Sequence, residues 1–148
     1  MVTKRILTIC TIVSHALIIV GIGHAIGFFF LLEIFAYSAI ATENFSFAFD
    51  QENHFPVIGF MTLLGQIVLV FSLFTKKKPI KSISQIAGHT LLWLSIFYFA
   101  YDTTNDNYLH LLSISCLPFA ICTLITFVGH PIKRFYEWII DKETIRES

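Results

Sequence analysis

Long apolar stretches separated by short polar connections dominate the chain. Four of them are long enough to cross a membrane as helices, at residues 6–34, 57–75, 83–101 and 108–129. About 20 apolar residues in a helix span the hydrocarbon core of a bilayer, which is about 30 Å thick. The pattern therefore predicts an all-α membrane protein, a four-helix transmembrane bundle that forms one integral membrane domain over residues 1–148.

The polar connections between these spans are short. We expect outer loops at about 41–55 and 102–107 and an inner loop at 76–82. After the fourth span, residues 131–148 predict a short amphipathic helix, because Pro131 suits the first turn of a helix. The apolar residues of this tail have the spacing of one helical face: Ile132, Phe135, Tyr136, Ile139 and Ile140. Such a helix would lie on the cytoplasmic membrane surface or dock to a partner protein.

Basic residues are confined to alternate connections. All 10 Lys and Arg residues lie before the first span, between the second and third spans, or after the fourth. The other two connections contain Asp and Glu but no Lys or Arg. By the positive-inside rule both termini are cytoplasmic. The composition, 55% hydrophobic and 14% charged, differs from the roughly 25% charged residues of soluble domains. These features predict a multi-pass protein of the plasma (inner) membrane with both termini inside.

Polar residues inside the predicted spans are the first candidates for a functional site. In a continuous first helix, His15 lies about 13.5 Å from the inner end, near the midplane. Gln66 lies about midway along the second span, and His89 about 9 Å from the inner end of the third. We expect these three side chains to approach one another. The same arithmetic puts His24 at the outer edge and Glu33 about 40 Å up, outside the hydrocarbon.

Glycine and proline are expected to shape two of the spans. Gly23 and Gly27 form a GxxxG motif, which predicts a helix-packing surface that lets another helix approach closely. Pro118 predicts a kink in the middle of the fourth span, because proline has no backbone N–H to donate to the preceding turn.

Histidine pairs also permit a haem hypothesis. Helical bundles bind haem between facing helices, and the possible axial pairs are His15 with His89 and His24 with His110. The spacing of the histidines and acids matches no recognised metal site. We therefore expect no metal and no cofactor as the leading interpretation, and no nucleic-acid partner.

Three functions remain open on these residues. The favoured one is a non-enzymatic accessory, assembly or immunity-type protein that binds another membrane component or a second copy of itself. The second is a membrane enzyme or small transporter for a lipid or an ion, with His15 and Gln66 as its polar centre. The third is a haem-binding electron carrier. No catalytic signature identifies an activity, so the sequence favours a protein that is not an enzyme.

Overall fold

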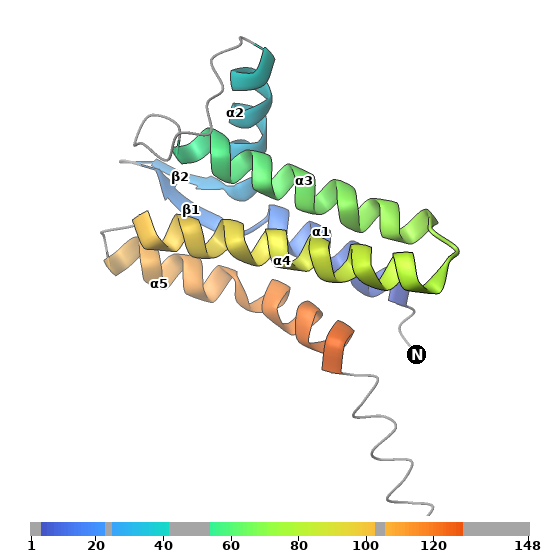
Figure 1. The fold of residues 1–148 in the computed structure, drawn as a ribbon. Helices are drawn as coiled ribbons and strands as arrows, with labels where there is room; N and C mark the ends of the chain where they lie inside the picture. The colour runs from blue at the N-terminus through green and yellow to red at the C-terminus, as the bar shows by residue number, and fades with distance from the viewer. Residues whose placement is uncertain (1–3, 23–24, 42–53, 103–105, 129–148) are drawn as a thin grey trace, which may run out of the picture.

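The computed structural model describes residues 4–22, 25–41, 54–102 and 106–128 (Figure 1). In chain order the elements are helix α1 (Lys4–Ala16), strands β1 (Ile19–Ile22) and β2 (Ala25–Phe28), and helices α2 (Phe29–Ala41), α3 (His54–Phe74), α4 (Lys78–Asp102) and α5 (Asp106–Ser115). A further helical segment covers residues 117–128. Helices α1, α3, α4 and α5 run alongside one another, whereas α2 crosses α3 steeply and points away from the bundle (Figure 1).

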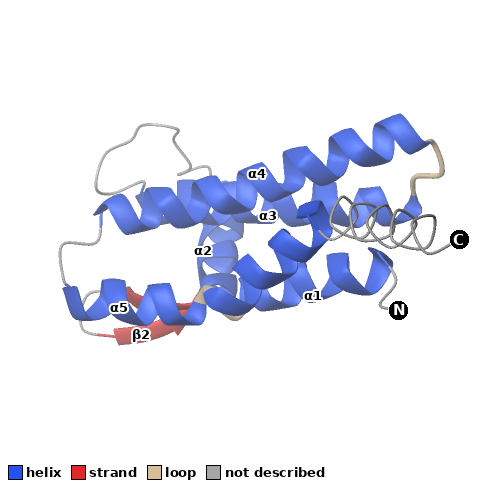
Figure 2. Ribbon diagram, turned by 90° about the horizontal axis from the view of Figure 1, so that it is seen from below, coloured by secondary structure: helices blue, strands red, loops and turns tan. Residues whose placement is uncertain are grey.

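Among the described residues, three helices are long and apolar enough to cross a membrane, which supports a membrane location. They are Phe55–Phe74, Lys78–Tyr101 and Tyr108–Val128, and they correspond to the three predicted spans that follow the first outer loop. The N-terminus and the α3–α4 connection lie at one end of the bundle, and residues 117–128 run toward that same end (Figure 2).

Several predicted connections are shorter than expected. Helix α4 begins at Lys78, inside the predicted inner loop at 76–82, because Pro79 is well suited to the first turn of a helix. Likewise α3 begins at His54 and α5 at Asp106, each just inside a predicted outer loop. The predicted tail helix at 131–148 lies outside the described residues.

The first predicted span is where the structure differs most from the sequence expectation. Helix α1 ends at Ala16, β1 and β2 form an antiparallel hairpin that pairs Ile19 with Phe28 and Ile22 with Ala25, and α2 follows. The segment is rich in glycine and in β-branched residues, and both weaken a helix. The prediction of one continuous helix over 6–34 is therefore wrong, and the fold is mostly helical rather than all-α.

The hairpin is held by contacts with the rest of the bundle as well as by its own ladder. The hydroxyl of Ser115 on α5 accepts a hydrogen bond from the Ile19 amide at 3.1 Å. The amide of Phe29 donates to the carbonyl of Ile18 at 2.9 Å and closes the base of the hairpin. At Gly21, a Cβ atom would collide with the ring of Tyr108 on α5, so only glycine lets the strand lie this close.

The glycines that permit close helix packing are not the predicted ones. Gly27 lies in β2 and Gly23 lies outside the described residues, so the structure has no helical GxxxG surface there. Helices α3 and α4 instead meet at Gly65 and Gly88. A Cβ on Gly88 would lie 3.0 Å from the carbonyl oxygen of Gly65 and 2.6 Å from Cγ of Leu69. The two backbones therefore touch where neither carries a side chain.

The fourth span is interrupted close to its proline. Helix α5 ends at Ser115, Cys116 adopts a turn, and the helix resumes at residue 117. The break lies two residues before Pro118, in agreement with the predicted kink. The interruption coincides with the place where Ser115 contacts β1.

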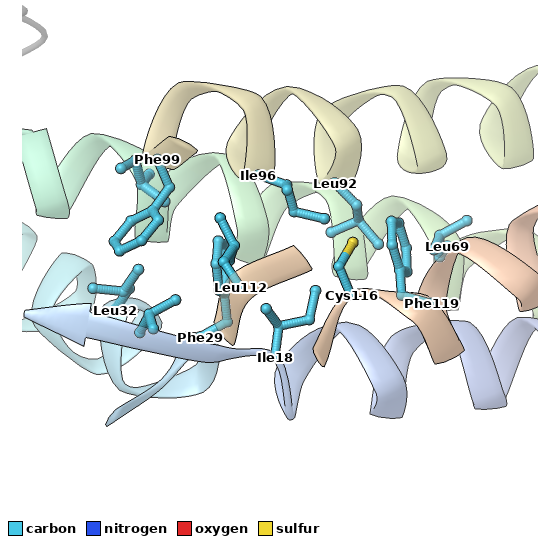
Figure 3. Packing of buried hydrophobic residues seen from close by; sticks show 12 residues of the cluster. Ile18, Phe29, Leu32, Leu69, Leu92, Ile96, Phe99, Leu112, Cys116 and Phe119 are labelled. Carbon is cyan, nitrogen blue, oxygen red and sulfur yellow. The ribbon is translucent and has the colours of Figure 1, made fainter. Parts of the chain in front are cut away.

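The apolar core runs along the bundle between the hairpin and the long helices (Figure 3). Phe29 and Phe119 are its largest fully buried side chains, and Ile18 and Leu92 are also fully buried. The cluster joins residues from α2, from residues 117–128, from the segment after α1 and from α4. The core therefore packs Ile18, Val20, Phe29 and Leu32 against α3, α4 and the last described helical segments.

The contact between Gly65 and Gly88 yields a stability prediction. In an unconstrained helix, Gly→Ala increases stability, by up to about 1 kcal/mol. Because of the short distances at Gly88, we expect Gly88→Ala to lower the free energy of unfolding by about 1–3 kcal/mol instead. Thermal unfolding in mild detergent measures this change. The control is Ala87→Val on the exposed side of the same turn, and equal effects of the two substitutions would contradict the close-contact account.

Candidate functional site

Several polar side chains are buried inside the bundle beside the apolar core, whereas many apolar ones are exposed on its outside. On α1, Thr8, Thr11 and His15 are fully buried, whereas Ile9 and Val13 are half exposed. Thr8, Thr11 and His15 share one face because residues three to four apart neighbour each other on a helix. This arrangement is typical of helices in lipid, where the solvent is as apolar as the side chains facing it.

His15 lies at the centre of this polar interior. Its Nε2 atom is 3.2 Å from the backbone carbonyl oxygen of Leu92 and 3.3 Å from Oγ of Ser95, both on α4. The rings of Phe29 and Phe119 approach the imidazole edge-on, each with centroids 5.0 Å away. His15 thus joins α1 to α4 and fills the space between two other segments of the chain.

The hydrogen bonds of His15 define which nitrogen carries the proton. The Leu92 carbonyl is only an acceptor, and the Ser95 hydroxyl already donates to that carbonyl at 2.7 Å. Nε2–H is therefore the donor, shared between the carbonyl and the serine oxygen. Nδ1 is left as a buried acceptor that has no hydrogen-bond partner among the described residues.

His89 lies one turn before Leu92 on α4 but has different partners. Its Nδ1 donates to the carbonyl of Gln85 at 2.7 Å, and its ring meets Phe127 edge-on at 4.9 Å. It lines a shallow groove of about 410 Å³ whose other lining residues include Trp93. The buried Nε2 atom has no hydrogen-bond partner within the described part of the chain.

Glu33 and Gln66 form a hydrogen bond between the side chains of α2 and α3. Nε2 of Gln66 donates to Oε1 of Glu33 at 2.6 Å. Gln66 lies about 18 Å from the start of α3 and about 12 Å from its end. The arithmetic that put Glu33 outside the hydrocarbon assumed a continuous first helix, which the structure does not have. The hairpin reverses the chain before α2 begins, so that Glu33 on α2 lies level with the middle of α3.

The three predicted intramembrane polar residues do not form one centre. His15 contacts α4, Gln66 contacts α2, and His89 bonds to its own helix. The haem hypothesis gains no support from this geometry, because Nε2 of His15 faces a carbonyl and its ring is packed between two phenylalanines. His110 is exposed on α5, and His24 lies outside the described residues.

Sequence reasoning missed two of the residues that complete these contacts. Ser95 was one serine among many, and no spacing rule links it to His15, which is 80 positions away. The contact of Glu33 with Gln66 does not follow from a continuous first helix, which separates the two side chains. The available signal was the run of glycine and β-branched residues before it, which weakens the case for a straight helix.

Comparison with known proteins adds no assignment to this site. No family model, curated protein or solved structure matches the chain. Within the described ranges, no three His, Cys, Asp or Glu side chains lie close enough together to hold a metal ion.

Packing around His15 predicts a graded response to substitution. His15→Ala leaves a cavity between Phe29 and Phe119, and we expect it to lower the free energy of unfolding by about 2–4 kcal/mol. His15→Leu keeps most of the volume and loses the hydrogen bond, which costs about 0.6–2 kcal/mol.

Reversible unfolding in mixed detergent micelles measures both changes, with Val13→Ala on the exposed face of α1 as the control. If His15→Ala is no more destabilising than His15→Leu, the packing account of this residue is wrong.

Proposed function

We propose that this chain is a non-enzymatic accessory protein of the membrane, which works by binding a helix of another membrane protein. The proposal concerns the exposed side of α2. It rests on one observation, which is that the half-buried carboxylate of Glu33 lies within this largely apolar surface.

Helix α2 buries only a narrow stripe. Phe29, Leu32 and Ala36 are buried, and a Cβ on Gly59 of α3 would collide with the carbonyl of Leu32, so α2 lies directly on the α3 backbone. Most of its remaining large side chains are exposed: Phe30, Ile34, Phe35, Tyr37 and Ile40. A 13-residue helix with this much exposed apolar surface has room for a second helix alongside it.

Glu33 gives that surface a preference for a polar partner. Oε1 accepts the hydrogen bond from Gln66, and the carboxylate makes no other hydrogen bond within the described residues. An acid at this depth requires further donors, and lipid tails have none. A partner helix that carries a hydroxyl, amide or basic side chain supplies them. That chemistry favours a protein partner over lipid alone.

The finer topology belongs to the same proposal. Helix α1 and strand β1 together extend over about 33 Å, at about 1.5 Å per helical and 3.3 Å per strand residue, which is enough to cross the hydrocarbon as a fourth span. The confinement of Lys and Arg to alternate connections supports cytoplasmic termini and a location in the plasma membrane.

Site-specific photocrosslinking in native membranes tests the α2 surface. A photoreactive residue at Phe35 should give a discrete protein adduct, and Glu33→Gln should reduce its yield several-fold, since the amide no longer offers a charged acceptor. The matched control is the same photoreactive residue at Phe97, which is similarly exposed on α4.

Three outcomes would count against the proposal. They are an adduct of equal yield from Phe97, an adduct that does not respond to Glu33→Gln, and crosslinking to lipid only. An adduct with the mass of two copies of the chain would assign the surface to self-association instead.

A second candidate, an ion-binding transporter, is favoured by the same pair of residues. An acid level with the middle of a span is a common element of proton and cation pathways. Under the accessory proposal, purified protein in vesicles that contain a pH-sensitive dye should show no proton flux above empty vesicles. A flux that is present in the wild type and lost in Glu33→Gln would replace the accessory function with transport.

A further inference from the structure

An open pocket of about 680 Å³ lies at the end of the bundle where the first turns of α1 meet the α3–α4 connection. It is built from parts of the chain that are about 70 residues apart in sequence. Its lining combines basic and apolar side chains: Arg5, Ile9, Leu73, Phe74, Thr75, Lys76, Lys78 and Lys81. A volume of this size is typical of pockets that hold small ligands.

Four cations share this pocket without a nearby acid in the described part of the chain. The acids described there are Glu33, Asp102 and Asp106. Glu33 is bonded to Gln66 in the middle of α3, and Asp102 is about 36 Å along α4 from Lys78. The positive charge is therefore not neutralised by these acids, and the pocket is suited to an anion with more than one negative oxygen.

The position of the pocket favours a lipid over a soluble anion. Phe74 is the last residue of one candidate span and Lys78 the first of the next, so the cations lie at the level of the headgroups. Ile9, Leu73 and Phe74 extend the lining toward the apolar layer. Apolar side chains beside a cluster of cations fit the glycerol and first acyl carbons of a phospholipid.

We propose that Arg5, Lys76, Lys78 and Lys81 form a binding site for the phosphate headgroup of an anionic phospholipid. The arginine supplies a planar fork for two phosphate oxygens, and the lysines act as point charges around it. The acyl chains lie against the apolar part of the lining. This site is independent of the α2 surface, which is reached from a different part of the bundle.

Native mass spectrometry of the full chain in mild detergent tests the site, with phosphatidylglycerol as the probe and phosphatidylcholine as the zwitterionic comparison. We expect one phosphatidylglycerol to be retained in preference to phosphatidylcholine. Arg5→Gln and Lys81→Gln should each weaken its binding about fivefold or more, the effect of removing one cation near an anionic surface. Lys81→Arg should retain it.

The control is Lys77→Gln, which removes the same charge from the same connection but does not line the pocket. A change of less than about twofold is expected there. Equal losses for Lys77→Gln and Lys81→Gln would overturn the site in favour of diffuse attraction. Equal retention of phosphatidylcholine would also overturn it. Displacement of the lipid by inorganic phosphate would show that the pocket takes the free anion instead.

Discussion

The backbone between Ile18 and Phe29 has to satisfy its hydrogen bonds without a helix, inside a structure that is otherwise helical. In a layer without water, an unpaired amide or carbonyl costs several kcal/mol, so non-helical backbone persists only where protein covers it. The hairpin ladder meets part of this need, and Ser115 and the contact of Phe29 with Ile18 meet more. The start of α2 depends on this hairpin, because Phe29 follows β2 directly and is buried in the core.

The hairpin also separates the features that the sequence predicts from those that it does not. The three later spans follow from hydrophobic length alone, and their helices lie close to the predicted bounds. The first span has the same composition, but length and apolarity do not distinguish a helix from a buried hairpin. That choice depends on Tyr108 and Ser115, which lie about 90 residues further along. The expected depth of Glu33 and the expected packing role of Gly27 both depend on a continuous helix, and Gly27 lies in β2 instead.

The burial of polar side chains on α1 also depends on tertiary contacts. Histidine and threonine on α1 are evident from the sequence, but only the fold decides that they face inward. Small hydroxyl side chains suit that position because each can bond to a carbonyl of its own helix, as Thr11 does with Leu7 at 2.9 Å. They need no partner from another helix, and they leave room for close packing. His15 differs, since its hydrogen bond reaches α4 and links two helices.

Helix α1 links the basic pocket at one end of the bundle to the middle of α4 through that hydrogen bond. Arg5 lines the basic pocket, and His15, about 15 Å further along the same helix, is fixed against α4. The packing of His15 between Phe29 and Phe119 holds α1 against the rest of the bundle and so contributes to where Arg5 lies. The same packing anchors the start of α2. The geometry of the basic pocket and that of the α2 surface therefore have one common support, although no described side chain in one contacts the other.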